Sequence, residues 1–166
     1  MSTKDYSFRQ EHSIASALGW EVVSGSGARP CVPGDIISDD WLGECKTHVD
    51  SGKPIAFNYK VWLKICDEAA MKHRSPALFV DDGSQSLANT WVLCYYHTIS
   101  GHELFKIAYP KATIPNISAT LQYFTDLVQS AKPLLGRSYE YVIIVHKWHN
   151  DNVAIMPFDT FKEICQ

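Results

Sequence analysis

The 166-residue sequence has no long apolar segment, no signal-like N-terminus and no strong excess of charge. A membrane-spanning helix needs about eighteen or more consecutive apolar residues, and no such stretch occurs. The N-terminal segment Met1–Asp5 also lacks the apolar core of a secretory signal. We therefore expect a cytoplasmic protein that does not insert into a membrane.

Cysteine pairs are also missing. The five cysteines are an odd number, and none forms a C-x-x-C pair, so a disulfide framework or a cysteine-rich zinc site is not expected. The glycine-rich loops that bind nucleotides and the G-x-S-x-G motif of acyl-transfer enzymes are absent as well. These absences exclude several common enzyme classes.

The net charge is only −3, which argues against a protein that coats nucleic acid nonspecifically. The charge is uneven, however. Residues 46–74 contain six basic and three acidic residues, a net charge of +3, and the rest of the chain carries −6. The sequence therefore predicts a local basic surface on an acidic protein, which could bind phosphate.

Apolar residues make up 46% of the chain, enough for one folded domain with a core. Hydrophobic periodicity predicts helices over residues 7–18, 59–73 and 117–131, the first with a capping box at Ser7 and a stop at Gly19. Strands are expected over 20–23, 35–38, 41–47, 77–80, 91–99, 103–108, 139–145 and 153–156, with 91–99 paired to 103–108, a turn at 150–152 and a short helix after Pro157. This order predicts an α/β domain in which helices cover a mixed sheet.

The segment Gly34–Lys46 contains the residues that indicate a function. If Asp39 and Asp40 form a two-residue hairpin turn, Asp35 lies opposite Glu44, with their Cβ atoms about 4.5–5.5 Å apart. Two carboxylates in this position repel each other unless one is protonated or a cation lies between them. Because Mg²⁺ prefers carboxylate oxygens and activates bound water, the pair predicts a metal-dependent hydrolytic site.

Two further side chains fit this site. Lys46 leaves the same face of its strand as Glu44, where its ammonium could orient the attacking water or offset charge on a phosphate. Glu11 shares a helical stripe with Ile14 and Leu18 that should face the sheet. A carboxylate on such a stripe is costly unless it is paired or metal-bound, so Glu11 is a candidate third acidic ligand.

The ordered set Glu11, Ser26, Asp35, Glu44 and Lys46 resembles the PD-(D/E)XK nucleases, and more narrowly the archaeal-type and phage Holliday-junction resolvases, over about residues 8–80. The resemblance implies a restriction-endonuclease-like mixed central sheet flanked by helices. We expect one nuclease domain over 1–166, with a core of about 6–110 and a C-terminal β/α elaboration of about 111–166. It also implies Mg²⁺ or Mn²⁺ as cofactor and a homodimer that cuts branched DNA.

Carried to these positions, the resemblance implies that Asp35 and Glu44 bind metal, that Glu11 completes the acidic cluster and that Lys46 assists catalysis. It also places Ser26 near the cleaved phosphate. Basic residues near the motif are candidate DNA contacts, although each could equally be a solvated surface charge: Arg29, Lys53, Lys60 and Lys64.

Two other functions remain open from the sequence. The first is a sequence-specific or repair nuclease with the same catalytic residues. The second is a protein that keeps the fold and binds DNA or another protein without cutting it.

Overall fold

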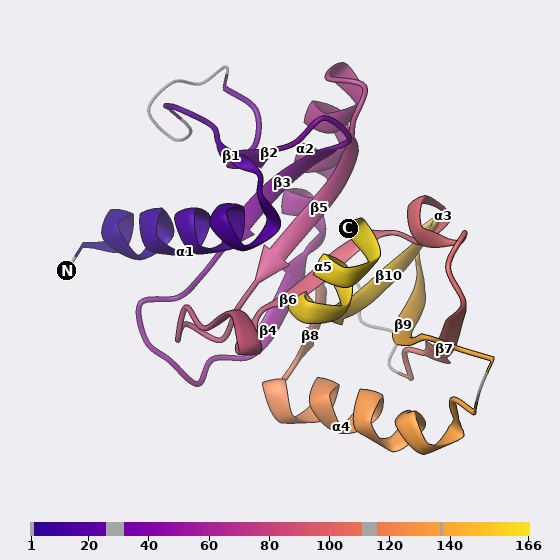
Figure 1. The fold of residues 1–166 in the computed structure, drawn as a ribbon. Helices are drawn as coiled ribbons and strands as arrows, with labels where there is room; N and C mark the ends of the chain where they lie inside the picture. The colour runs from indigo at the N-terminus through magenta and orange to yellow at the C-terminus, as the bar shows by residue number, and fades with distance from the viewer. Residues whose placement is uncertain (1, 26–31, 111–115, 137) are drawn as a thin grey trace.

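The computed structural model describes residues 2–25, 32–110, 116–136 and 138–166. Eight strands form the main sheet in the order β1-β2-β3-β5-β6-β10-β9-β7, and β4 pairs with β8 in a second sheet (Figure 1). The strands are β1 (Glu21–Val22), β2 (Ile36–Ile37), β3 (Trp41–Lys46), β4 (Ile55–Asn58), β5 (Ser75–Val80), β6 (Trp91–Tyr95), β7 (Leu104–Ala108), β8 (Asn116–Ala119), β9 (Tyr141–Trp148) and β10 (Asp151–Pro157). The α-helices are α1 (Thr3–Leu18), α2 (Tyr59–Met71), α3 (Tyr96–Ile99), α4 (Leu121–Ala131) and α5 (Phe158–Cys165).

The main sheet is mixed. Its neighbouring strands are antiparallel except for the β3–β5 and β7–β9 pairs, which are parallel. A parallel pair needs a long crossover, and β4 and α2 supply it between β3 and β5. The expected mixed sheet flanked by helices is confirmed. Strands β9 and β10, from the C-terminal part of the chain, lie within this sheet, with β10 next to β6 and β9 between β10 and β7.

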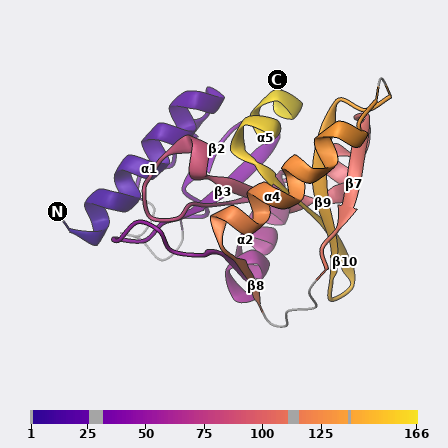
Figure 2. The same ribbon diagram turned by 90° about the horizontal axis from the view of Figure 1, so that it is seen from below.

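Each face of the main sheet has its own core. Helices α1 and α5 pack on one face, where Ile14 and Phe161 meet Phe79. Helices α2 and α4 pack on the opposite face, where Ile65 and Phe124 join one core, together with the small β4–β8 sheet (Figure 2). Strand β3 therefore lies between α1 on one side and α2 on the other.

Local sequence explains how the helices begin. Asn58 caps α2, because its side-chain oxygen accepts hydrogen bonds from the backbone N–H groups of Lys60 and Val61. The predicted start of α1 at Ser7 is wrong: the helix begins at Thr3, and the Asp5 carboxylate accepts a hydrogen bond from the Ser2 backbone N–H at 2.6 Å. This earlier capping box adds one turn to the helix. The predicted stop at Gly19 is confirmed, with φ of 71°.

The predicted pairing of residues 91–99 with 103–108 is wrong. Strand β6 ends at Tyr95, and the residues after it form the short helix α3. β6 pairs instead with β5 and β10, whereas β7 pairs with β9. The reason is burial: Trp91 to Cys94 are buried on both faces, so β6 is a central strand.

Two other boundaries differ from the expectation. The predicted helix over 117–131 divides into β8 and α4, because the Thr120 side chain caps a new helix by accepting a hydrogen bond from the Tyr123 N–H. The β9–β10 turn lies one residue earlier than predicted. Trp148 pairs with Asp151, which leaves His149 (φ 55°) and Asn150 as the turn.

Within the described residues, Cys45, Cys66, Cys94 and Cys165 are free thiols, as expected. No helix in the described ranges is both long and apolar enough to cross a bilayer. The expected short helix after Pro157 is present as α5.

Candidate active site

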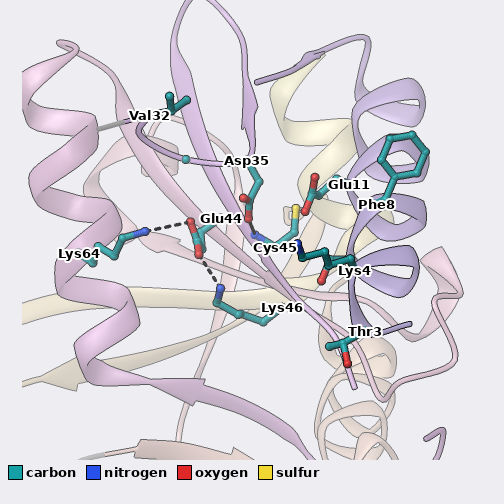
Figure 3. Close-up of a pocket in the computed structure, with 12 residues that line it drawn as sticks. Thr3, Lys4, Phe8, Glu11, Val32, Asp35, Glu44, Cys45, Lys46 and Lys64 are labelled. Atoms are coloured by element: carbon teal, nitrogen blue, oxygen red, sulfur yellow. Dashed lines mark hydrogen bonds and ion pairs between the residues drawn. The ribbon is translucent and has the colours of Figure 1, made fainter. Parts of the chain in front are cut away.

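A pocket of about 580 Å³ opens beside the C-terminal half of β3, between α1 and α2 (Figure 3). Residues from α1, from the segment before β2, from β3 and from α2 line it: Thr3, Lys4, Ser7, Phe8, Glu11, Val32, Gly34, Asp35, Glu44, Cys45, Lys46 and Lys64. The four residues predicted as catalytic from the sequence are all among them. The structure thus brings Glu11, Asp35, Glu44 and Lys46 to one pocket.

The hairpin that carries Asp35 and Glu44 has the predicted register. Ile36 pairs with Gly43 and Ile37 with Leu42, and Asp39 and Asp40 lie at the turn, closed by a Ser38 N–H to Trp41 carbonyl hydrogen bond of 3.0 Å. In this register the next pair would be Asp35 with Glu44. Regular pairing ends at Ile36, and Asp35 lies in a bend instead.

Two glycines allow the close packing of this hairpin. Gly34 has a φ of 68°, and a Cβ there would lie 2.8 Å from Leu42. Gly43 lies against Ile36 and Phe79, and a Cβ would come within 2.7 Å and 2.8 Å of these side chains. Larger residues at either position would therefore push β2 and β3 apart and displace Asp35.

The two hairpin carboxylates have different partners. One oxygen of Asp35 accepts a hydrogen bond of 2.8 Å from the Cys45 backbone N–H, which fixes this side chain to β3. The Glu44 carboxylate is buried and lies 2.6 Å from the Nζ of Lys46 and 3.7 Å from the Nζ of Lys64 (Figure 3). Each carboxylate is therefore held in place, and Glu44 has two ammonium groups beside it.

Lys64 belongs to a chain of contacts that joins α2 to the hairpin. Its Nζ also lies 3.4 Å from Glu68, one helical turn further along α2. Glu68 in turn accepts a hydrogen bond of 3.0 Å from the Gly34 backbone N–H, directly before Asp35. The sequence analysis missed Glu68, although its i,i+4 spacing from Lys64 was a visible signal.

Glu11 reaches the pocket from the other face of the sheet. Side chains alternate along β3, so that Glu44 and Lys46 share a face with Leu42, in the α2 core, while Cys45 belongs to the α1 core. Burial, followed by the negative charges of Asp35 and Glu44, raises the pKa of Glu11 to about 7. The carboxylate of Glu11 is therefore close enough to both hairpin carboxylates to interact with them electrostatically. Its role as a metal ligand stays a prediction.

The end of β3 has a buried anchor that the sequence analysis also missed. Gln10 is buried, and its Nε2 donates a hydrogen bond of 2.9 Å to the Lys46 carbonyl oxygen. The Asp81 backbone N–H reaches the same oxygen at 3.3 Å. The Asp81 carboxylate is itself fixed by Thr47, whose hydroxyl lies 2.6 Å away. The backbone of Lys46 is thus held from two sides.

The predicted DNA contacts fall into three groups. Lys64 lines the pocket, as described above. Lys53 and Lys60 are exposed and do not line it. Ser26 and Arg29 lie outside the described residues.

The donor atoms around the pocket suit a hard divalent cation. Among the described residues, no three His, Cys, Asp or Glu side chains are grouped so that they could hold a metal ion. Mg²⁺ does not require such a cage, because it commonly uses one or two carboxylates and completes its shell with water and substrate phosphate. Asp35 and Glu44 supply such a pair. A positive charge beside them would also oppose the repulsion that raises the pKa of Glu11.

Comparison of the chain with protein-family models, with curated proteins and with solved structures gave no match. The site's own chemistry therefore carries the functional argument.

Proposed function

We propose that the protein is a metal-dependent DNA endonuclease with a restriction-endonuclease-like catalytic fold. The observation that carries this proposal is the β2–β3 hairpin. Its register brings Asp35 and Glu44 to the same pocket, with the Lys46 ammonium 2.6 Å from Glu44. Two acidic side chains in one pocket repel each other, whereas a bound divalent cation would hold them together and activate water for hydrolysis.

Asp35 and Glu44 would hold Mg²⁺ or Mn²⁺, which when bound supplies Lewis-acid activation of water and of a phosphate oxygen. Lys46 keeps its proton, because the negative charge of Glu44 and their hydrogen bond raise its pKa. It therefore acts as a fixed cation that can orient a water molecule or neutralise charge on the phosphate. Glu11 lines the same pocket and would complete the acidic cluster as a third metal ligand.

The charge of the pocket supports a phosphodiester substrate. Three lysines line it, Lys4, Lys46 and Lys64, next to the three carboxylates. Cations at the rim attract the DNA backbone, and the carboxylates would be shielded from it by the bound metal. The pocket between β3 and α2 thus offers one place for both a metal and a phosphate.

Branched DNA cut by a homodimer is the substrate and assembly that we propose, following the sequence resemblance. Two copies would present two sites to opposite strands of a junction. A synthetic four-way junction and a linear duplex of matched sequence, each incubated with the full chain and Mg²⁺, test this substrate. Faster cleavage of the junction is expected. Equal rates would indicate a sequence-specific or repair nuclease instead.

The metal mechanism has its own test. Cleavage should rise with Mg²⁺, stop in EDTA and be lost in Asp35→Asn, which keeps a side-chain oxygen for the Cys45 N–H. Asp126→Asn on α4 is the matched control, because Asp126 is exposed and bonded only within its helix to Gln122 in the contacts described. Crystals soaked in Mn²⁺ should show density beside Asp35 and Glu44. Cleavage that survives both EDTA and Asp35→Asn would refute the metal mechanism, and DNA binding without cleavage would indicate a non-catalytic protein.

A further inference from the structure

The N-terminal half of α1 is a helix without a core beneath it. The buried residues of α1 all lie in its second part: Gln10, Ile14 and Ala15. The first turns carry only exposed or partly buried side chains, and in Figure 1 they extend beyond the edge of the main sheet. The capping box of Ser2 and Asp5 keeps these turns helical. Nothing in the packing of the fold requires an aromatic residue there.

Phe8 nevertheless stands on this projecting part, and 60% of its surface is exposed. The His12 ring lies against it, with 3.8 Å between the ring centroids, and His12 Nδ1 lies 2.8 Å from the Phe8 carbonyl oxygen. His12 is one helical turn further along, so the pair is held by the helix itself. The Phe8 ring thus packs against His12, and the rest of its surface is exposed and available to a ligand.

The position of Phe8 connects it to the candidate active site. Thr3, Lys4, Ser7 and Phe8 line the same pocket as Asp35 and Glu44. Figure 3 shows Thr3, Lys4 and Phe8 along α1, on one side of the pocket. This wall combines an aromatic ring, an ammonium group and two hydroxyl groups. Single-stranded nucleic acid is bound by this combination: bases stack on aromatic side chains while cations and hydroxyl groups contact the backbone.

We infer that Phe8 is a stacking platform for one unpaired nucleobase next to the phosphate in the pocket, with Lys4 beside the adjoining backbone. This inference rests on the proposed nuclease function and narrows its substrate. A base in an intact duplex is already stacked on its neighbours and cannot reach the ring without being turned out. The preferred DNA therefore has unpaired nucleotides at the cleavage point, as at an opened branch or a flap.

The test uses the full chain in EDTA, so that no strand is cut. The probe is a short single-stranded oligonucleotide containing one 2-aminopurine, whose fluorescence falls when the base stacks. A blunt duplex of the same length is the comparison ligand. Phe8→Ala should weaken single-strand binding about tenfold and abolish the fluorescence change. It should leave duplex binding within about twofold, because the lysines of the pocket remain.

Two variants control for folding and for loss of apolar surface. Phe8→Tyr keeps the ring and should keep the fluorescence change. Met71→Ala removes an exposed apolar side chain of α2, 72% exposed and outside the pocket lining, and should change neither ligand's affinity. Circular dichroism should be the same for all variants, because alanine favours an exposed helix position.

The outcomes separate this inference from the proposed function. One outcome is that cleavage depends on metal and on Asp35, while single-strand binding does not change in Phe8→Ala. This outcome refutes base stacking on Phe8 and leaves the nuclease proposal in place. A fluorescence change that depends on Phe8, in a protein that never cuts DNA, supports the platform and refutes the nuclease. If Phe8→Ala instead dissociates a dimer and leaves base stacking intact, Phe8 is a contact between copies and the inference is wrong.

Discussion

Two hairpins of the main sheet have turns of the same length but differ in what they bring together. In the β9–β10 hairpin, apolar residues face each other at the centre, with Ile144 opposite Ile155, both fully buried. In the β2–β3 hairpin, pairing stops after two residue pairs, and acidic side chains follow where a third pair would form. The first hairpin is built for stability. The second hairpin has fewer paired residues and places two negative charges in one pocket. Such locally unfavourable arrangements are typical of functional sites.

If this contrast is right, changes in the β9–β10 hairpin should act on folding, and changes near the β2–β3 hairpin should act on chemistry. The largest expected effect is on folding. Ile155→Ala leaves a cavity in a core without exposed surface and should lower the free energy of unfolding by about 2–5 kcal/mol. Urea denaturation measures this. Asn152→Ala, at an exposed position of the same strand, should cost far less, and equal losses would show that β10 is not a core strand.

The next effect is on catalysis. Lys46→Met should slow cleavage about 100-fold, because it removes the cation nearest Glu44 and close to the water and phosphate positions. Mn²⁺ binding should persist, since both carboxylates remain. Lys60→Met, at an exposed position outside the pocket, is the control for loss of a positive charge. A similar loss of activity in both variants would assign Lys46 to general DNA attraction.

A smaller effect concerns the carboxylate of Glu11, whose pKa is raised first by burial and then by the negative charges of Asp35 and Glu44. The pKa of Glu11 is raised from 4.5 to about 7 in the folded protein, so the unfolded chain loses its proton first as the pH rises. The free energy of unfolding in EDTA should therefore fall as the pH rises from 4.5 to 7. Because Glu11 is only half-buried, Glu11→Gln should stabilise the metal-free protein at pH 8 by no more than about 1 kcal/mol, and by nothing below pH 4.

Thermal denaturation across this pH range measures the difference. Glu21→Gln on β1, an exposed glutamate outside the pocket, should leave the pH dependence unchanged. Wild type and Glu11→Gln curves that stay parallel at every pH would mean that folding does not raise the pKa of Glu11.

The smallest expected effect is at Lys64. Its ammonium is 58% exposed and lies 3.7 Å and 3.4 Å from Glu44 and Glu68, so these ion pairs are largely screened by water. Lys64→Met should change the free energy of unfolding by at most about 0.5 kcal/mol, measured by urea denaturation. A loss of several kcal/mol would show that the ion pairs of the pocket stabilise the fold, so that the β2–β3 hairpin would not differ from the β9–β10 hairpin in this respect.

The features that could be predicted from the sequence are local ones. The β2–β3 register follows from a two-residue turn and the spacing of Asp35 and Glu44 around it. The position of α2 follows from the apolar spacing of its core-facing residues and from the Asn58 cap. In both cases the determining contacts join residues that are close in sequence, so a pattern reveals them.

The missed features depend on contacts between distant segments. The pairing of β6 with β10 joins residues about sixty positions apart, and nothing in either strand specifies its partner. Gln10 bonds to Lys46 only because α1 packs on that face of the sheet. Lys64 was recognised as a basic residue, but its approach to Glu44 depends on how α2 lies against β3.

The shared carbonyl oxygen of Lys46 links the pocket to the turn that follows β5. Gln10 and the Asp81 N–H both bond to this oxygen, and a Cβ at Gly83 would collide with the Asp50 carbonyl oxygen. The turn consequently has little freedom to change its length. An inserted residue there is expected to rotate the end of β3 and move the lysine ammonium away from Glu44, although the turn does not line the pocket. The geometry of the pocket could therefore be altered through this turn without substituting any residue that lines the pocket.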